Sequence, residues 1–204
     1  MHLPSMNRAI FTSPHEFKLE HGTSLSSLEI VYHSDGVLNA QKDNVIWFCH
    51  ALTANSDVAD WWDSLVGVGK TYDPTKYFII CANIIGSCYG SSGPLTIDKE
   101  TNRPYYSNFP MVTIRDMVQA HILLRKHLGI EKINTLIGGS MGGYQVLEWA
   151  VAEPQVIDQL VLVATSPQES AWGIAIHTAQ RLAIETDPTW RDMNANAGAQ
   201  GLKT

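Results

Sequence analysis

The chain has 204 residues, of which 45% are hydrophobic and 17% charged, as is typical of one globular domain with a sizeable core. Its 14 basic and 20 acidic residues give a net charge of −6 without a basic run, so nucleic acids and anionic membranes are not expected partners. No apolar run approaches the roughly 18 residues of a transmembrane helix, and residues 1–14 lack a signal-peptide pattern.

The first part of the chain predicts an irregular arm followed by a pair of strands. Residues 1–14 are mixed in character and contain prolines, so we expect no regular structure there. Residues 17–19 and 28–32 predict two strands joined around His21-Gly22. Apolar side chains alternate from Leu28 to Tyr32, as in a half-exposed antiparallel pair.

Four later segments are nearly continuously apolar, which is typical of strands covered on both faces of a parallel sheet. They are residues 45–49, 77–82, 133–137 and 160–164. Between them, Thr113 and Asp116 fit a capping box at the start of a helix that Gly129 ends. Residues 144–152 predict another helix. This alternation predicts an α/β fold with a doubly wound, mostly parallel sheet.

Polar loops follow the first two of these strands. The first is residues 50–55, and the second is the glycine- and serine-rich stretch 83–94. Long loops at the carboxyl ends of parallel strands usually carry function, although a flexible surface loop is the alternative for 83–94. Trp61 and Trp62 are more simply explained by packing, given the area each can bury.

The three cysteines, Cys49, Cys81 and Cys88, have neither a C-x-x-C pair nor a disulfide-framework spacing. Cys49 and Cys81 lie in apolar strand segments and are most simply small core residues. This usage favours a reducing, cytoplasmic setting, and we expect no metal site.

The most informative stretch is the G-x-S-x-G pattern centred on Ser140, which stands between a strand and a helix. In that context the serine sits on a tight turn with its hydroxyl pointing out of the sheet. Met141 can offer its backbone N–H to a developing oxyanion at the positive helix N-terminus. A chance serine in a glycine-rich turn is the alternative. A phosphate-binding loop is disfavoured, because no Gly-Lys-Ser or Gly-Lys-Thr follows this turn and no G-x-G-x-x-G pattern is present. We therefore predict that Ser140 is a nucleophile.

After Pro167 the character of the chain changes. Residues 171–185 predict an amphipathic helix that Asp187-Pro188 ends, and the last dozen residues are small and polar. The chain ends without a closing strand or helix.

Several motifs, in order along residues 15–190, resemble the homoserine O-acetyltransferase family of the α/β-hydrolase fold. They are His50-Ala51-Leu52-Thr53 with Trp61-Trp62, Cys88-Tyr89-Gly90-Ser91 with Gly93-Pro94, Phe109-Pro110 with Thr113-Ile114-Arg115-Asp116-Met117, and Gly138-Gly139-Ser140-Met141-Gly142-Gly143 with Glu148-Trp149-Ala150. The resemblance implies acetyl transfer from acetyl-CoA to the hydroxyl of L-homoserine, a step towards methionine, through acetyl-Ser140. It also implies an oxyanion hole made by the backbone N–H groups of Leu52 and Met141. No permanently bound cofactor is implied, because acetyl-CoA acts as a substrate.

The resemblance also implies that the acid and the histidine of the triad follow a helical lid, beyond Thr204. We therefore expect an N-terminal fragment of the fold, with part of the core in residues 1–167 and the start of the lid in residues 168–204. Neither His50, beside the oxyanion loop, nor His177, in the lid helix, fits the position of the base. The 204-residue chain alone is expected to lack transferase activity, and the complete protein to form a homodimer through the lid.

Three residues depart from the usual pattern of the family. Ala54 and Ser87 replace glycines, and Tyr144 replaces a common methionine, so the preference for the acyl acceptor could differ. An esterase of the same fold and a truncated, non-catalytic binding domain remain alternative functions. The sequence does not distinguish acetyl from succinyl donors, or homoserine from serine acceptors.

Overall fold

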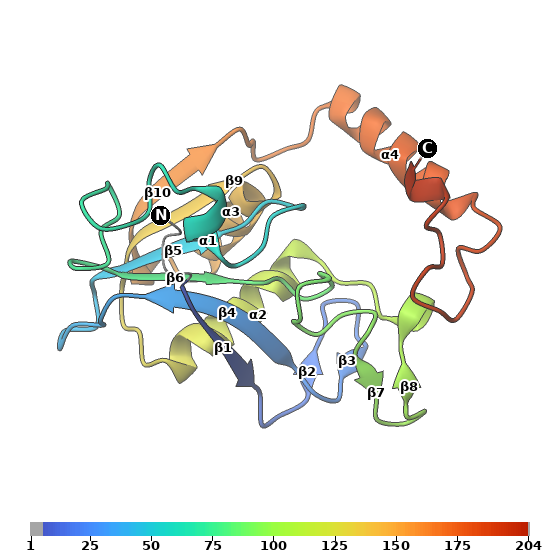
Figure 1. The fold of residues 1–204 in the computed structure, drawn as a ribbon, viewed down its shortest axis with the longest axis horizontal. Helices are drawn as coiled ribbons and strands as arrows, with labels where there is room; N and C mark the ends of the chain where they lie inside the picture. The colour runs from blue at the N-terminus through green and yellow to red at the C-terminus, as the bar shows by residue number, and fades with distance from the viewer. Residues whose placement is uncertain (1–5, 204) are drawn as a thin grey trace.

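The computed structural model describes residues 6–203 and has a six-stranded sheet at its centre (Figure 1). The strands lie in the order β1-β4-β6-β5-β9-β10. Their bounds are Asn7–Thr12 (β1), Glu29–Asp35 (β4), Val45–Cys49 (β5), Phe78–Ala82 (β6), Ile133–Gly139 (β9) and Ile157–Val163 (β10). The last four in spatial order are parallel, and β1 and β4 are antiparallel. The mostly parallel sheet expected from the sequence is confirmed.

Helices cover both faces of this sheet. They are α1 (Val58–Trp61), α2 (Ile114–His127) and α3 (Met141–Ala152), while α4 (Ala171–Glu185) stands apart from the core (Figure 1). Val118 of α2 and Trp149 of α3 belong to the core on one face. Val58 of α1 packs with Phe48 on the other. All five residues of β5 are buried, which explains its continuous apolar run. No helix within residues 6–203 is both long enough and apolar enough to cross a membrane.

Smaller elements complete the described chain. They are the strand pairs β2 (Phe17–Lys18) with β3 (Ser24–Leu25) and β7 (Ile97–Asp98) with β8 (Arg103–Pro104), and the 3-10 helices Tyr106–Asn108, Pro154–Val156 and Gly201–Lys203. The rings of Trp61 and Trp62 stack with their centroids 5.4 Å apart. The ring of Trp62 also packs edge-on against that of Phe48, with the two ring centroids 5.9 Å apart. The structural explanation of these tryptophans is confirmed.

The predicted start of α2 is also confirmed. Thr113 Oγ1 accepts a hydrogen bond from the backbone N–H of Asp116 at 3.2 Å, and Asp116 Oδ2 accepts one from the N–H of Thr113 at 2.9 Å. Asp116 also accepts a hydrogen bond from the N–H of Glu20 at 2.8 Å. The cap therefore fixes both the helix and the segment that follows β2.

The N-terminal strands pair differently from the prediction. Residues 7–12 form β1, so the expectation of an irregular arm is wrong there, and residues 1–5 lie outside the described part of the chain. The predicted strand 28–32 overlaps β4, which begins at Glu29 and pairs with β1 and β6, whereas β2 pairs with β3. The alternation in β4 indicates a half-covered strand but does not identify its partner. β1 gave no signal because most of its side chains are exposed.

The expectation that residues 160–164 form a buried strand is wrong as well. β10 lies at the edge of the sheet and, among the described strands, pairs only with β9. Leu160 and Leu162 are each 43% exposed, and Val163 is 41% exposed. An apolar run indicates a strand that can be covered on both faces, but it does not show where the strand lies in the sheet.

Candidate active site

Ser140 lies at the turn between β9 and α3, at the carboxyl edge of the sheet. Its backbone has φ 52° and ψ −121°, a conformation that L-residues rarely adopt and that costs on the order of 1–3 kcal/mol. Its N–H donates to the carbonyl of Val163 at 3.0 Å, and its carbonyl accepts from the N–H of Gly143 at 2.9 Å. The residue itself is exposed. A strained, exposed serine at a strand-to-helix turn is the geometry that the sequence motif predicts.

Two glycines allow the elements around Ser140 to pass very close to each other. A Cβ atom on Gly142 would lie 2.0 Å from the carbonyl oxygen of Cys49, at the end of β5. A Cβ atom on Gly138 would lie 2.2 Å from the carbonyl oxygen of Gly142. The first turn of α3 therefore rests directly on the backbone of β5 and β9.

This contact brings the predicted oxyanion donors to the same edge of the sheet. Cys49 is paired with Gly138, and Leu52 follows three residues after Cys49. Leu52 is 69% exposed, and within residues 6–203 its N–H donates none of the hydrogen bonds found in turns and loops. The N–H of Met141 opens α3, where the first amides have no acceptor within the helix. Both amides can face a ligand near Ser140, and their role as oxyanion donors stays a prediction.

His50 supports the loop that carries Leu52. The imidazole is fully buried, its Nδ1 bonds the carbonyl of Ala51 at 2.8 Å, and its Nε2 accepts from the N–H of Ile84 at 3.2 Å. Burial lowers the pKa of His50, and the bond to the Ala51 carbonyl opposes this shift in part. The contacts require a neutral ring with the proton on Nδ1. Both nitrogens are thus used to hold backbone groups in place.

No hydrogen bond joins Ser140 Oγ to another residue in the part of the chain that the structure describes. His177 lies on α4 and contacts Glu169 at 3.8 Å. Within residues 6–203, no group of three or more His, Cys, Asp or Glu side chains could hold a metal ion. We assign no general base among the described residues.

The glycine- and serine-rich loop after β6 is anchored rather than loose. Ser91 Oγ donates to the carbonyl of Asn83 at 2.7 Å and accepts from the N–H of Val31 at 3.0 Å. Ser92 Oγ accepts from the N–H of Glu29 at 2.9 Å. These bonds attach the loop to β4, so the structure does not support the alternative of a free surface loop.

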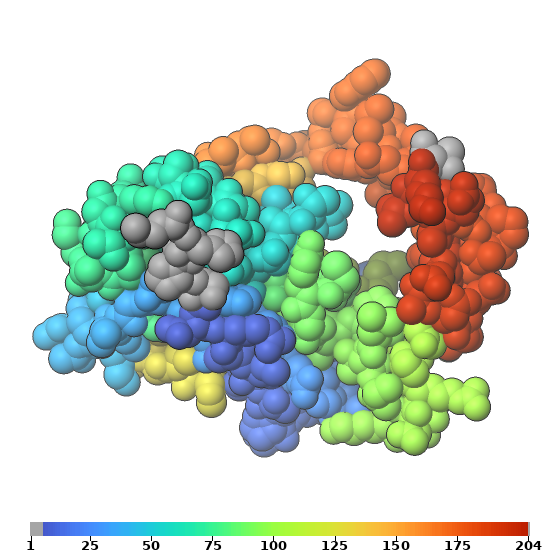
Figure 2. All heavy atoms as spheres, in the orientation of Figure 1, coloured from blue at the N-terminus to red at the C-terminus, as the bar shows by residue number. Residues whose placement is uncertain are grey.

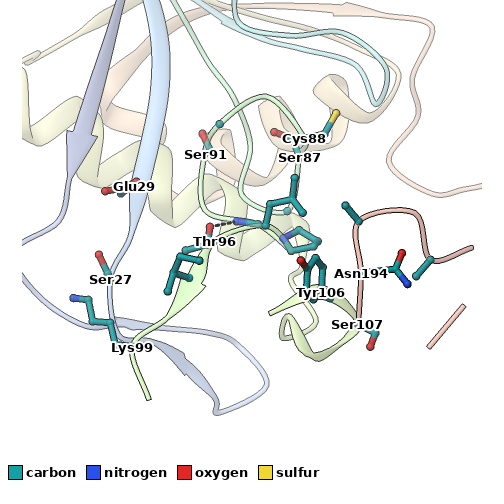
Figure 3. Close-up of a pocket in the computed structure, with 18 of the residues that line it drawn as sticks. Ser27, Glu29, Ser87, Cys88, Ser91, Thr96, Lys99, Tyr106, Ser107 and Asn194 are labelled. Carbon is teal, nitrogen blue, oxygen red and sulfur yellow. Dashed lines mark hydrogen bonds between the residues drawn. The ribbon is translucent and has the colours of Figure 1, made fainter. Parts of the chain in front are cut away.

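The same loop lines a cavity of ≈ 960 Å³ that faces the C-terminal segment (Figure 3). The loop contributes Ser87, Cys88 and Thr96 to its lining, and the C-terminal segment contributes Trp190 and Asn194. None of the three predicted site residues is among those that line the cavity. The cavity is therefore separate from the turn at Ser140.

Sequence reasoning missed two buried amides that hold the site together. Gln145 Nε2 donates to the carbonyl of His50 at 3.3 Å and joins α3 to the end of β5. Asn83 Oδ1 accepts from the N–H of Ser56 at 2.8 Å, and its Nδ2 donates to the carbonyl of Tyr89 at 3.0 Å. Each amide directly adjoins an apolar run, which is the signal that could have identified it.

Comparison with known proteins places this geometry in a family. Residues 44–203 match the family model described as the alpha/beta hydrolase fold. A homoserine O-acetyltransferase of Cyclobacterium marinum is 46% identical over 199 residues, which are 98% of this chain and 57% of that protein. The chain thus spans little more than half the length of this curated relative.

Two solved structures are also similar. The homoserine O-acetyltransferase from Bacillus anthracis superposes with a TM-score of 0.90 at 27% identity, over 98% of this chain and 58% of that one. An acetylester hydrolase from Corynebacterium glutamicum superposes with a TM-score of 0.83 at 28% identity, over 96% of this chain and 56% of that one. Both structures share the fold of this chain. Their names indicate different acyl acceptors, homoserine for the transferase and water for the hydrolase.

Proposed function

Because the chain belongs to the α/β-hydrolase fold family, we propose that it supplies the nucleophile of an acyltransferase that moves an acetyl group from acetyl-CoA to the hydroxyl of L-homoserine. The observation that carries the proposal is the strained, exposed turn at Ser140, resting on the backbone of β5. The names of the relatives support the choice of reaction.

The proposed reaction has two steps. Ser140 Oγ attacks the thioester carbonyl, the C–S bond breaks, and CoA leaves as the thiol with the proton that the serine loses. The hydroxyl of homoserine then attacks the acetyl-Ser140 ester, its proton returns to Ser140 Oγ, and O-acetylhomoserine is released. In each step the carbonyl oxygen becomes negative and accepts hydrogen bonds from the N–H groups of Leu52 and Met141.

The remaining parts of the proposal concern the surroundings of this reaction. We propose a cytoplasmic enzyme without a permanently bound cofactor or metal, with core residues 1–167 and a lid that starts in residues 168–204. A homodimer through the lid is supported by apolar side chains that α4 exposes, such as Trp172 at 77% and Ile174 at 53%.

The direct test is to identify the acylated residue. After the full-length protein is incubated with acetyl-CoA, mass spectrometry should locate an acetyl group on the peptide that contains Ser140. Addition of homoserine should remove the group and yield O-acetylhomoserine. Acetylation of a different residue, with turnover intact, would show that the nucleophile is wrongly assigned.

An esterase with water as the acceptor is the second candidate, and the similarity to an acetylester hydrolase supports it. The same samples separate the two functions. Transfer requires that acetyl-Ser140 disappears much faster with homoserine than in buffer alone. Equal rates of loss, with acetate as the only product, would favour the esterase.

The oxyanion loop gives a second prediction. Leu52→Pro removes the backbone donor and should lower kcat by about 10²–10³, the usual loss when one oxyanion donor is removed. Leu52→Ala keeps the donor and is the matched control, because the side chain is largely exposed and should matter little. Circular dichroism must first show that Leu52→Pro is folded. A folded Leu52→Pro variant with normal kcat would exclude this donor.

A further inference from the structure

The helix α4 makes little contact with the core. None of its residues is buried, and open space separates it from the core (Figures 1 and 2). At its far end, Trp190 and Asn194 line the cavity beside the loop after β6. At its near end, the chain reaches α4 from β10 through residues 164–170, which are exposed or half-buried. At the C-terminal end of α4, the segment that follows it packs back on Ala183 and reaches Ser107, whose Oγ donates to Met193 Sδ at 3.6 Å. At the N-terminal end, polar contacts attach α4 to the core.

One such contact joins the start of α4 to the helix that follows Ser140. Tyr144 lies on α3, one helical turn after Ser140, and its hydroxyl donates to Glu169 Oε2 at 2.6 Å. Glu169 directly precedes Ser170, the N-cap of α4. The hydrogen bond raises the pKa of Tyr144 and lowers the pKa of Glu169, as expected for a phenol that donates to a carboxylate.

The same carboxylate also lies against the first turns of α4. Glu169 Oε1 accepts from the N–H of Ser170 at 3.2 Å, and Oε2 lies 3.8 Å from Nδ1 of His177. A Cβ atom on Gly173 would be 2.0 Å from Oε1, so the absence of a side chain there leaves room for the carboxylate. A negative charge at this place is favoured by the helix dipole. Glu169 therefore contacts α3 and α4 at once.

We propose that Tyr144 and Glu169 form a clamp that fixes the direction of α4 relative to Ser140, so that Tyr144 is a positioning residue for the acyl-transfer site. The consequence for catalysis rests on the proposed function, whereas the clamp itself does not. Figure 2 shows that α4 borders the open space beside the core, so the direction of α4 sets the shape of that space.

The position of α4 can be measured without any substrate. Spin labels on Val151→Cys in α3 and Gln180→Cys in α4, in a Cys88→Ser background, report the distance between the two helices. Both labelled positions are exposed. Cys49 and Cys81 are buried and their thiol pKa values are raised by burial, so they remain unlabelled. A failure of acetyl transfer leaves this measurement unaffected.

The parent chain should give one narrow distance peak. Tyr144→Phe should lower the ratio of docked to displaced α4 roughly 2- to 10-fold, the range for loss of one hydrogen bond. Glu169→Ala should do the same, and Glu169→Gln should largely restore the peak, because its amide oxygen still accepts from the phenol. Tyr77→Phe is the matched control. Tyr77 precedes β6 at the amino ends of the parallel strands, whereas Ser140 lies at their carboxyl ends, so this variant should leave the distance peak unchanged.

Two outcomes would overturn the clamp. One is a Tyr144→Phe peak identical to that of the parent. The other is a Glu169→Gln peak as broad as that of Glu169→Ala, which would assign the effect to the charge rather than to the bond with Tyr144. If Tyr144→Phe does not fold, the two Glu169 variants decide, because they change a side chain at the surface.

Discussion

Ser140→Ala should lower acetyl transfer by the full-length protein by about 10⁴–10⁶-fold, the scale of loss when the serine of a catalytic triad is removed. Alanine cannot form the acetyl ester, so neither step of the proposed reaction can take place. The oxyanion donors and substrate binding remain, and they should leave a residual rate roughly 10³–10⁴-fold above that in water. Initial rates of O-acetylhomoserine formation measure the loss.

The matched control for this experiment is Ser64→Ala. Ser64 is also exposed, but it lies in the loop after α1, away from the turn between β9 and α3. Its variant should keep the parental rate. If Ser140→Ala retained more than about a tenth of the activity, a different group would carry the acetyl transfer.

Gly142→Ala should destabilise the chain by about 3 kcal/mol or more, at the upper end of what overpacking costs. The new Cβ would lie 2.0 Å from the carbonyl oxygen of Cys49, and this neighbour is backbone that cannot rotate away. Either α3 or the end of β5 must move. Unfolding in urea, followed by circular dichroism, measures the change in the free energy of unfolding.

Gly139→Ala tests whether this cost comes from the close contact. Gly139 belongs to the same turn, but a Cβ atom there would meet its nearest neighbour, the carbonyl oxygen of Val163, at 3.5 Å, an ordinary contact. Its free energy of unfolding should change by less than about 1 kcal/mol. Equal losses in the two variants would show that the contact with β5 is not what makes Gly142 necessary.

The sequence was sufficient to predict the elements that surround Ser140. The strand before it, the helix after it and the buried β5 all have local signals, namely an apolar run, a glycine pattern and helical spacing. The position of β10 at the edge of the sheet had no such signal, because neighbours in a sheet are chosen by contacts far apart along the chain. β1 was missed for a different reason, because most of its side chains are exposed and leave no apolar pattern.

The placement of the candidate site residues was also partly predictable, while their roles stay predictions. Ser140 and Met141 follow from a local motif, and Leu52 follows from the family resemblance, and the structure brings all three to one edge of the sheet. The bond between Gln145 and His50 spans 95 positions of sequence, and the bond between Tyr144 and Glu169 links α3 to a separate helix. An adjoining apolar run could mark Gln145 as buried, but no local pattern indicates which residue it bonds, so only the folded chain could show these contacts.

The place of β5 between β6 and β9 also affects how the protein must assemble as it is synthesised. β6 follows β5 closely in the chain, whereas β9 follows only after the long loops and α2. At roughly 5–20 residues per second, several seconds separate the emergence of β5 from that of β9. Until then, one side of β5 is an unpaired edge that other nascent chains could join. The close contact of Gly142 with Cys49 also waits for the residues after β9, so the surroundings of Ser140 are completed late in synthesis.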